Sequence, residues 1–274
     1  LDLTSTFSKE QQAIQLSLRA FLETNAMSLM SEAYSLERFP VELISGLAKL
    51  NVFGANLSGY GLAGLDHIAY GLMMQELERC DSGLRSFASV QGALVMYPIY
   101  SYGSEEQKRK WLPQLAKGEV IGCFGLTEAT GGSDPSVMQT SVQKTKDGWL
   151  LNGSKMWVTN ANLAKIAIIW AKVGQVVRGF IVPLDTQGVL VKKIKGKLSL
   201  RVSPTSHLYF DNVRLSDDVV LPKTDGLKHA LSCLTQARYG IAWGVLGAAM
   251  ACFDAAVSYA KERVLFGEVL ASKQ

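Results

Sequence analysis

The stretch CFGLTEATGGSDP, residues 123–135, begins as an apolar run and ends in small, hydroxylated and acidic residues. Thr127, Glu128 and Thr130 stand just before the run Gly131-Gly132-Ser133-Asp134. Glycine, serine and aspartate are common in tight turns, a Gly-Gly-Ser run also suits a flexible link, and Asp-Pro favours the start of a turn. Taken alone, the stretch is best interpreted as a turn that follows a strand.

The sequence before this stretch is typical of helices, because its apolar residues recur at three- and four-residue spacing. Helix starts are expected near Ser8, Pro40, Asp66, Asp81 and Ser104. Ser104-Glu105-Glu106-Gln107 has the form of a capping box. The helix after Asp81 is expected to end near Pro98, because proline breaks the helical hydrogen-bond ladder.

The sequence after residue 120 is typical of short strands. Seven β-rich runs are expected, at 121–127, 149–152, 155–159, 166–172, 179–183, 189–194 and 207–210. Asp147-Gly148 and Asn152-Gly153 are expected turns between them, which favours an antiparallel sheet or barrel.

A helical pattern returns from about residue 225 to 266. A helix of roughly forty residues would be ~60 Å long at 1.5 Å per residue, and its apolar face would need neighbouring helices. The sequence to Gln274 contains no further helical pattern, so we expect a piece of a longer protein. The fold class is therefore α+β and multi-domain, with a helical domain over 1–119, a β-domain over 120–222 and the start of a second helical domain over 223–274.

Composition excludes several classes of function. The 274 residues are 48% hydrophobic and 19% charged, with a net charge of +4, so a large core is expected rather than disorder. The basic residues are scattered, which argues against nucleic-acid binding. The three histidines are isolated, so no metal site is expected, and four cysteines without C-x-x-C spacing indicate reduced thiols. No apolar run reaches 18 residues, so no membrane span is expected.

A G-x-G-x-x-G match at 59–64 is not interpreted as a dinucleotide fingerprint. That fingerprint follows a strand within a βαβ unit, whereas Gly59 and Gly64 lie between two expected helices. We predict a loop ahead of Asp66.

Three segments in this order resemble the acyl-CoA dehydrogenase family over essentially the whole chain. CFGLTEATGGSDP resembles the flavin loop of that family, KMWVTNA at 155–161 its second flavin strand, and AKERVLFG at 260–267 its R-x-x-F-G segment. The departure is Ala129-Thr130-Gly131, where the family usually has Pro-Asn-x. The resemblance implies a helical domain, a middle antiparallel β-domain and a C-terminal helical bundle, of which only the first long helix is present.

The resemblance also implies FAD as cofactor. The residues implied to bind it are Phe124, Gly125, Leu126, Thr127, Gly132, Ser133, Trp157 and Thr159. Backbone N–H groups of a small-residue loop can approach a flavin edge and a pyrophosphate closely, because no Cβ intervenes. The alternative for Trp157 and Thr159 is ordinary strand packing.

Arg263, Phe266 and Gln274 resemble family positions that reach the FAD of a neighbouring subunit. The guanidinium of Arg263 would suit the pyrophosphate. The alternative is a solvated helix arginine. The family implies a homotetramer.

Within the family, the resemblance is greatest to the glutaryl-CoA dehydrogenase branch. It is carried by ELERCDSGLRS at 76–86, YGSEEQ at 102–107 and ARYGIAWG at 237–244, although Leu84 stands where an aromatic residue is common. This branch implies substrate binding by Arg85, Ser86, Ser133 and Arg238, with Arg85 on the distal carboxylate. The alternatives are an Arg85–Asp81 pair on a helix surface and an internal helix ion pair for Arg238.

The implied reaction is α,β-dehydrogenation of an acyl-CoA thioester. The expected substrate is glutaryl-CoA, decarboxylated to crotonyl-CoA in lysine and tryptophan degradation, with an electron-transfer flavoprotein as acceptor. The alternatives are a short-chain acyl-CoA dehydrogenase, a non-decarboxylating glutaryl-CoA dehydrogenase and a non-catalytic acyl-CoA- or flavin-binding protein. No catalytic residue is named, because the glutamate base of this branch lies beyond residue 274. The expected compartment is the bacterial cytoplasm, with the mitochondrial matrix as alternative; Leu1 leaves a removed targeting segment open.

Overall fold

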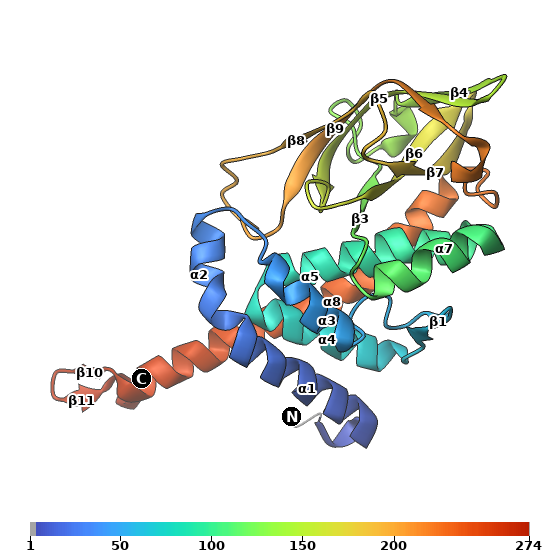
Figure 1. The fold of residues 1–274 in the computed structure, drawn as a ribbon. Helices are drawn as coiled ribbons and strands as arrows, with labels where there is room; N and C mark the ends of the chain where they lie inside the picture. Colours follow the sequence, from blue (N-terminus) through green and yellow to red (C-terminus); the bar gives the residue numbers. More distant parts are fainter. Residues whose placement is uncertain (1–3, 274) are drawn as a thin grey trace.

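The computed structural model describes residues 4–273 and arranges them as a helical part, a curled sheet and a long helix that crosses the helical part (Figure 1). The helices of the first part are α1 (Lys9–Asn25), α2 (Met27–Ser35), α3 (Ile44–Lys49), α4 (His67–Cys80), α5 (Ser82–Ser89), the π-helical η3 (Val90–Met96), α6 (Tyr97–Tyr102) and α7 (Glu105–Ala116). The strands of the sheet are β3 (Gly122–Gly125), β4 (Ser141–Thr145), β5 (Gly148–Thr159), β6 (Ile166–Val173), β7 (Val176–Pro183), β8 (Val189–Lys193) and β9 (Thr205–Leu215). The long helix α8 (Lys228–Glu262) leads to a small hairpin, β10 (Val264–Leu265) and β11 (Glu268–Val269).

The predicted caps are formed. Ser8 and Ser104 each accept a hydrogen bond from the backbone N–H of the residue three positions on, at 3.2 Å, and each completes a capping box with that residue's side chain. Asp66 caps α4 through the N–H of Ala69 at 2.8 Å. Short hydroxyl and carboxylate side chains satisfy amides that the first helical turn leaves without partners, which is why the sequence could locate these starts.

The predicted helix end near Pro98 is wrong. Helix α5 passes into η3 and continues as α6 to Tyr102, and the Tyr97 N–H donates to the Gly92 carbonyl five residues back. The π turn places Pro98 in the first turn of α6, where its missing N–H is not needed. Helix α2 was not expected.

The G-x-G-x-x-G segment is a loop, as predicted. It forms a tight hairpin between β1 (Ser58–Gly59) and β2 (Leu62–Ala63) instead of the strand-to-helix turn of a nucleotide fold.

The sheet is mixed rather than purely antiparallel. Its order is β3-β6-β4-β5-β9-β8, with β7 paired to β6. Most neighbours are antiparallel, but β3 runs parallel to β6, and β4 meets β6 in a parallel pairing of Ser141 with Lys172. Strand β3, which follows the helical part, therefore lies alongside β6, and the loop after Gly125 begins where β3 ends.

Strand β5 is one twelve-residue strand, so the predicted Asn152-Gly153 turn is wrong. Gly153 has φ of +134° at a register shift, and a Cβ there would lie 2.6–2.9 Å from side-chain atoms of Thr140. A second register shift lies between Lys155 and Val158, where Trp157 has φ of +60°. Such bulges bend a strand and re-aim its side chains, and this one is at the end of β5 that carries the predicted flavin residues.

Helix α8 has 35 residues and packs along α4 through buried glycines, so the predicted helix of about forty residues is correct in position but ends at Glu262. Its opposite face exposes Ile241, Val245, Leu246, Phe253 and Tyr259. By length and composition α8 could cross a membrane, and only 17% of its most apolar window is buried. The expected absence of a membrane span stays a prediction.

Two buried amide side chains connect the helical part to the sheet. Gln91 in η3 donates to the carbonyls of Leu115 and Val120, at 3.0 and 2.9 Å, and accepts from the Gly122 N–H at 2.9 Å. Asn160 at the end of β5 donates to the Phe87 carbonyl at 3.2 Å. Because buried polar groups without partners are costly, these bonds fix where β3 and β5 meet α5 and η3.

Replacing Asp66 with alanine should lower the free energy of unfolding by about 1 kcal/mol at neutral pH, as expected for a lost cap. The backbone N–H of Ala69 and the Gln11 side chain lower the pKa of Asp66 from its ordinary value. The cap's contribution is therefore present above the unfolded-state pKa and is lost as pH falls through the folded-state pKa. Urea unfolding should show the difference between wild type and Asp66→Ala shrinking in acid. Asp66→Asn keeps the acceptor and should show a smaller loss without this pH dependence.

Candidate functional site

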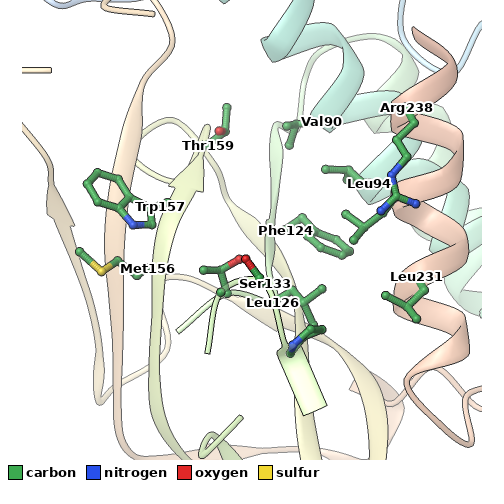
Figure 2. Close-up of a pocket in the computed structure, with 14 residues that line it drawn as sticks. Val90, Leu94, Phe124, Leu126, Ser133, Met156, Trp157, Thr159, Leu231 and Arg238 are labelled. Atoms are coloured by element: carbon green, nitrogen blue, oxygen red, sulfur yellow. The ribbon is translucent and has the colours of Figure 1, made fainter. Parts of the chain in front are cut away.

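A cavity of about 360 Å³ lies where the ends of β3 and β5 face η3 and the first turns of α8 (Figure 2). Eight predicted site residues line it, namely Phe124, Leu126, Thr127, Gly132, Ser133, Trp157, Thr159 and Arg238. The other lining residues are Val90, Leu94, Pro135, Met156, Leu231 and Leu234. Four segments that are far apart in the sequence therefore form one site.

The two sides of the cavity differ in chemistry. The helical side is apolar apart from Arg238, whereas the sheet side carries the hydroxyls of Thr127, Ser133 and Thr159. Within residues 4–273, these hydroxyls and the backbone amides of Thr127, Gly132 and Ser133 make no hydrogen bond. A Cβ at Gly132 would meet only the Thr127 Cγ2 at 4.0 Å, so a ligand can approach the loop backbone. This set of donors and acceptors beside apolar walls fits a planar ring with a polar edge, such as a flavin.

The loop after β3 is also a closed turn. The N–H of Glu128 donates to the Gly131 carbonyl at 3.1 Å, and the Gly131 N–H donates back at 3.2 Å. Asp134 accepts from the N–H of Ser136 at 3.0 Å at the start of the next short helix, η4 (Pro135–Val137). The turn interpretation and the binding interpretation of this stretch are therefore compatible.

A buried ion pair lies beneath the loop. The Lys155 side chain is fully buried, and its Nζ donates to the Glu128 Oε1 at 2.7 Å and to the Leu126 carbonyl at 3.0 Å. Burial lowers the pKa of Lys155 to about 8, although Glu128 opposes that shift. For Glu128, burial raises the pKa, but the hydrogen bonds from Lys155, Thr140 and Gln139 outweigh it and the net pKa is lowered. Both shifts leave the pair charged at neutral pH.

Trp157 and Thr159 follow this pair on β5. The Trp157 side chain is 54% exposed beside the cavity, in the left-handed backbone conformation that bulky residues rarely adopt. At 54% exposure the Trp157 ring does not belong to the packed face of the strand, so burial in the core does not account for this residue.

Arg238 extends from α8 toward the cavity (Figure 2). It is exposed, and among the described residues it takes part in no ion pair. The internal ion pair suggested as its alternative is therefore absent from the described residues.

Arg85 and Ser86 lie on α5 and do not line the cavity. The Arg85 Nε donates to the Glu78 Oε2 in a pair whose side chains are 11% and 7% exposed. The alternative Arg85–Asp81 pair is not formed, because Asp81 instead accepts from the Gly83 N–H at 2.6 Å at the start of α5. No further hydrogen bond of the Arg85 guanidinium occurs within residues 4–273, so its two terminal nitrogens are left for other acceptors.

Gly125 does not line the cavity either. A Cβ there would lie 2.7 Å from the Ile169 Cδ1 and 3.0 Å from the Lys155 Cγ. Its glycine is explained by the close approach of β3 to β6 and to the Lys155 stem rather than by ligand contact.

Arg263 and Phe266 lie far from the cavity. Arg263 directly follows α8, and Phe266 lies in the turn between β10 and β11, at the opposite end of the helix from the sheet (Figure 1). The helical rise places Arg263 roughly 37 Å along the axis from Arg238. Phe266 is 96% exposed, so this chain does not bring either residue to its own cavity. Gln274 lies outside the described residues.

Several lining residues were missed. Val90, Leu94, Leu231 and Leu234 fit an apolar helix face, and Met156 alternates with buried residues on a strand. Their pattern predicts burial but does not say whether a side chain faces a core or a cavity.

The lining contains no carboxylate and no histidine. Residues 4–273 also hold no cluster of side chains suited to a metal, and their four cysteines are free. The site as described can bind and orient a ligand, while Arg238 is its only charged group.

Known proteins match this chain throughout. Family models match at 8–119, 123–213 and 224–274, described as the N-terminal, middle and C-terminal domains of acyl-CoA dehydrogenase. A glutaryl-CoA dehydrogenase from Mycobacterium smegmatis, solved in complex with FADH2, is 45% identical with a TM-score of 0.97, covering 99% of this chain and 70% of that one. The chain belongs to the acyl-CoA dehydrogenase family.

Short-chain members of the family are also similar to this chain. Butyryl-CoA dehydrogenase from Megasphaera elsdenii is 33% identical with a TM-score of 0.92, covering 97% of this chain and 72% of that one. The mitochondrial short-chain specific acyl-CoA dehydrogenase of Bos taurus is 33% identical over 96% of this chain. The chain spans only 66% of the length of that relative, just under two thirds.

Proposed function

We propose that the protein is an FAD-dependent acyl-CoA dehydrogenase of the glutaryl-CoA type. The observation that carries the proposal is the cavity itself, in which free hydroxyls and amides of two sheet segments face apolar helical walls and one arginine. The 45% identity to a glutaryl-CoA dehydrogenase solved with FADH2 supports both cofactor and substrate class.

In this proposal the sheet side holds the isoalloxazine of FAD. Thr127 would bind the pyrimidine edge, Ser133 would bind the pyrophosphate, and Trp157 would pack against the ring. Thr159 would donate a hydrogen bond to the flavin. FAD, when bound, supplies the acceptor for the β-hydrogen of the thioester as a hydride.

The helical side holds the acyl-CoA. Val90, Leu94 and Leu234 exclude water around the acyl chain, and Arg238 offers a cation to the CoA portion. The α-proton needs a carboxylate base, and the described lining supplies none, so the proposal assigns that role to no residue of this chain.

Arg85 is proposed to bind the distal carboxylate of glutaryl-CoA, with Ser86 beside it. The terminal nitrogens of Arg85 are not engaged by Glu78, and a planar guanidinium suits bidentate carboxylate binding. The product is proposed to be crotonyl-CoA after loss of CO₂, with glutaconyl-CoA as the alternative.

A short-chain acyl-CoA is the second candidate substrate. It is favoured by the Arg85–Glu78 pair, which already neutralises the arginine, and by curated short-chain relatives at 32–34% identity. The absence of a carboxylate from the lining keeps a non-catalytic acyl-CoA- or flavin-binding role as the third.

The assembly is proposed to be a homotetramer. In it, the exposed face of α8 packs against other helices, and Arg263, Phe266 and Gln274 reach the FAD of a neighbour. An electron-transfer flavoprotein is the proposed acceptor. The proposed domains are 1–119, 120–222 and 223–274, and the proposed compartment is the bacterial cytoplasm, with the mitochondrial matrix as alternative.

Anaerobic titration of the FAD-loaded protein with glutaryl-CoA and butyryl-CoA tests the proposal. Bleaching of the flavin absorption by glutaryl-CoA at much lower concentration than by butyryl-CoA would support the glutaryl-CoA assignment. Equal bleaching by both would favour the short-chain enzyme. Bound flavin that neither compound reduces would favour the non-catalytic role.

A further inference from the structure

The loop after β3 and the end of β5, which both face the cavity, are joined by contacts on the side away from it. The Met156 N–H donates to the Thr127 carbonyl at 2.8 Å, and Lys155 bonds both the Leu126 carbonyl and the Glu128 carboxylate. Three contacts therefore join residues 126–128 of the loop to residues 155 and 156 of β5.

Glu128 extends this connection to the next segment. Its Oε2 accepts from the Gln139 N–H at 2.6 Å and its Oε1 from the Thr140 N–H at 3.0 Å. The Glu128 carboxylate therefore connects the start of the loop to residues 139 and 140, so one side chain fixes both ends of residues 129–138.

The ion pair also lies next to a strained backbone. Two residues, Met156 and Trp157, stand opposite the single residue His207 in the β5–β9 pairing, and Trp157 has φ of +60°. Such a conformation is strained and persists only where surrounding contacts impose it. Lys155, immediately before the bulge, is fixed by its buried charge, and Asn160, just after it, by its bond to Phe87.

A buried ion pair is a weak device for stability, because desolvation of the two charges offsets much of their attraction. Its directional bonds can nevertheless fix relative position. We propose that Lys155 and Glu128 are positioning residues that hold the Thr127–Ser133 loop and the Met156–Thr159 segment at the separation that a flavin ring requires. This inference rests on the proposed function of the cavity as an FAD site.

The test uses a double variant that removes both charges and keeps an acceptor for the loop amides, Lys155→Met/Glu128→Gln. A single substitution would leave one buried charge without its partner and could simply unfold the protein. The matched control is Arg19→Met/Glu76→Gln, which removes another largely buried pair, joined at 2.7 Å between α1 and α4 and away from the cavity.

Two readouts are taken for both variants and for wild type, beside the melting temperature. The first is the FAD dissociation constant with the visible spectrum of bound FAD. We expect the FAD dissociation constant of the Lys155→Met/Glu128→Gln variant to rise about 10–100-fold, by analogy with the effect of removing residues that orient metal ligands. The visible spectrum of its bound FAD should also change. The control should match wild type in both, whatever its melting temperature.

The second readout is amide hydrogen exchange of the FAD-free protein. Exchange at the hydrogen-bonded amides of Glu128, Gly131 and Met156 should quicken in the Lys155→Met/Glu128→Gln variant, while β6 and β7 stay protected. Unchanged exchange at these three amides, or wild-type FAD affinity and spectrum in that variant, would overturn the inference. If wild type binds no FAD while exchange still quickens, the proposed function fails, and only the part of the inference that the ion pair holds the two segments together remains.

Discussion

Replacing Arg85 and Glu78 together with methionine is expected to weaken glutaryl-CoA binding about 100-fold. The variant loses the ion pair between Arg85 and the distal carboxylate of the substrate, and losing such a pair costs roughly 2–5 kcal/mol of binding free energy. A difference of about 1.4 kcal/mol corresponds to a tenfold change in the dissociation constant. In the native protein the terminal nitrogens of Arg85 are free of protein partners within residues 4–273, and Glu78 holds the side chain by its Nε alone. Calorimetric titration of the protein with glutaryl-CoA measures the change.

Butyryl-CoA is the matched control ligand, because it lacks the distal carboxylate and should bind the double variant nearly as it binds wild type. Both charges are removed together since Arg85→Met alone would leave Glu78, which is only 8% exposed, without a partner. Equal weakening for both ligands would contradict a role of Arg85 in carboxylate binding.

Gly247→Ala is expected to lower the free energy of unfolding by about 3 kcal/mol, near the upper end for overpacking. A Cβ at this position would lie 1.9 Å from the Gln75 carbonyl oxygen of α4, and backbone cannot rotate away as a side chain can. The gain of about 1 kcal/mol in helix propensity is too small to compensate. The melting temperature should fall by roughly 6–12 °C.

Gly226→Ala is the control for this change, because no heavy atom lies within 4 Å of a Cβ at Gly226 and its φ is not positive. It should leave the melting temperature near that of wild type. A Gly247→Ala variant that melts with wild type would mean that the close contact of α4 and α8 is not needed for stability.

Short sequence motifs predicted most of the helix starts and much of the cavity. Ser8, Asp66 and Ser104 cap the helices that they were predicted to cap, because a cap depends on residues within one turn. The loop and strand motifs likewise located Thr127, Ser133, Trp157 and Thr159 at one cavity.

Features that depend on distant segments were not predictable. Neither the partner of Lys155, 27 residues away, nor that of Arg85 could be read from sequence spacing. The bulge at Trp157 and the π turn before Pro98 arise because β9 and the neighbouring helices impose a register that the local sequence does not specify. Tertiary contacts, rather than propensity, decide such positions.

The central claim is that the cavity between the sheet and α8 holds FAD, and titration of the FAD-free protein with FAD tests it most directly. Tryptophan emission should be quenched in a saturable way. Trp157→Phe should still bind FAD but lose a larger share of the quenching than Trp111→Phe, since only Trp157 of these two lines the cavity. The absence of saturable quenching, or equal losses in the two variants, would contradict the account.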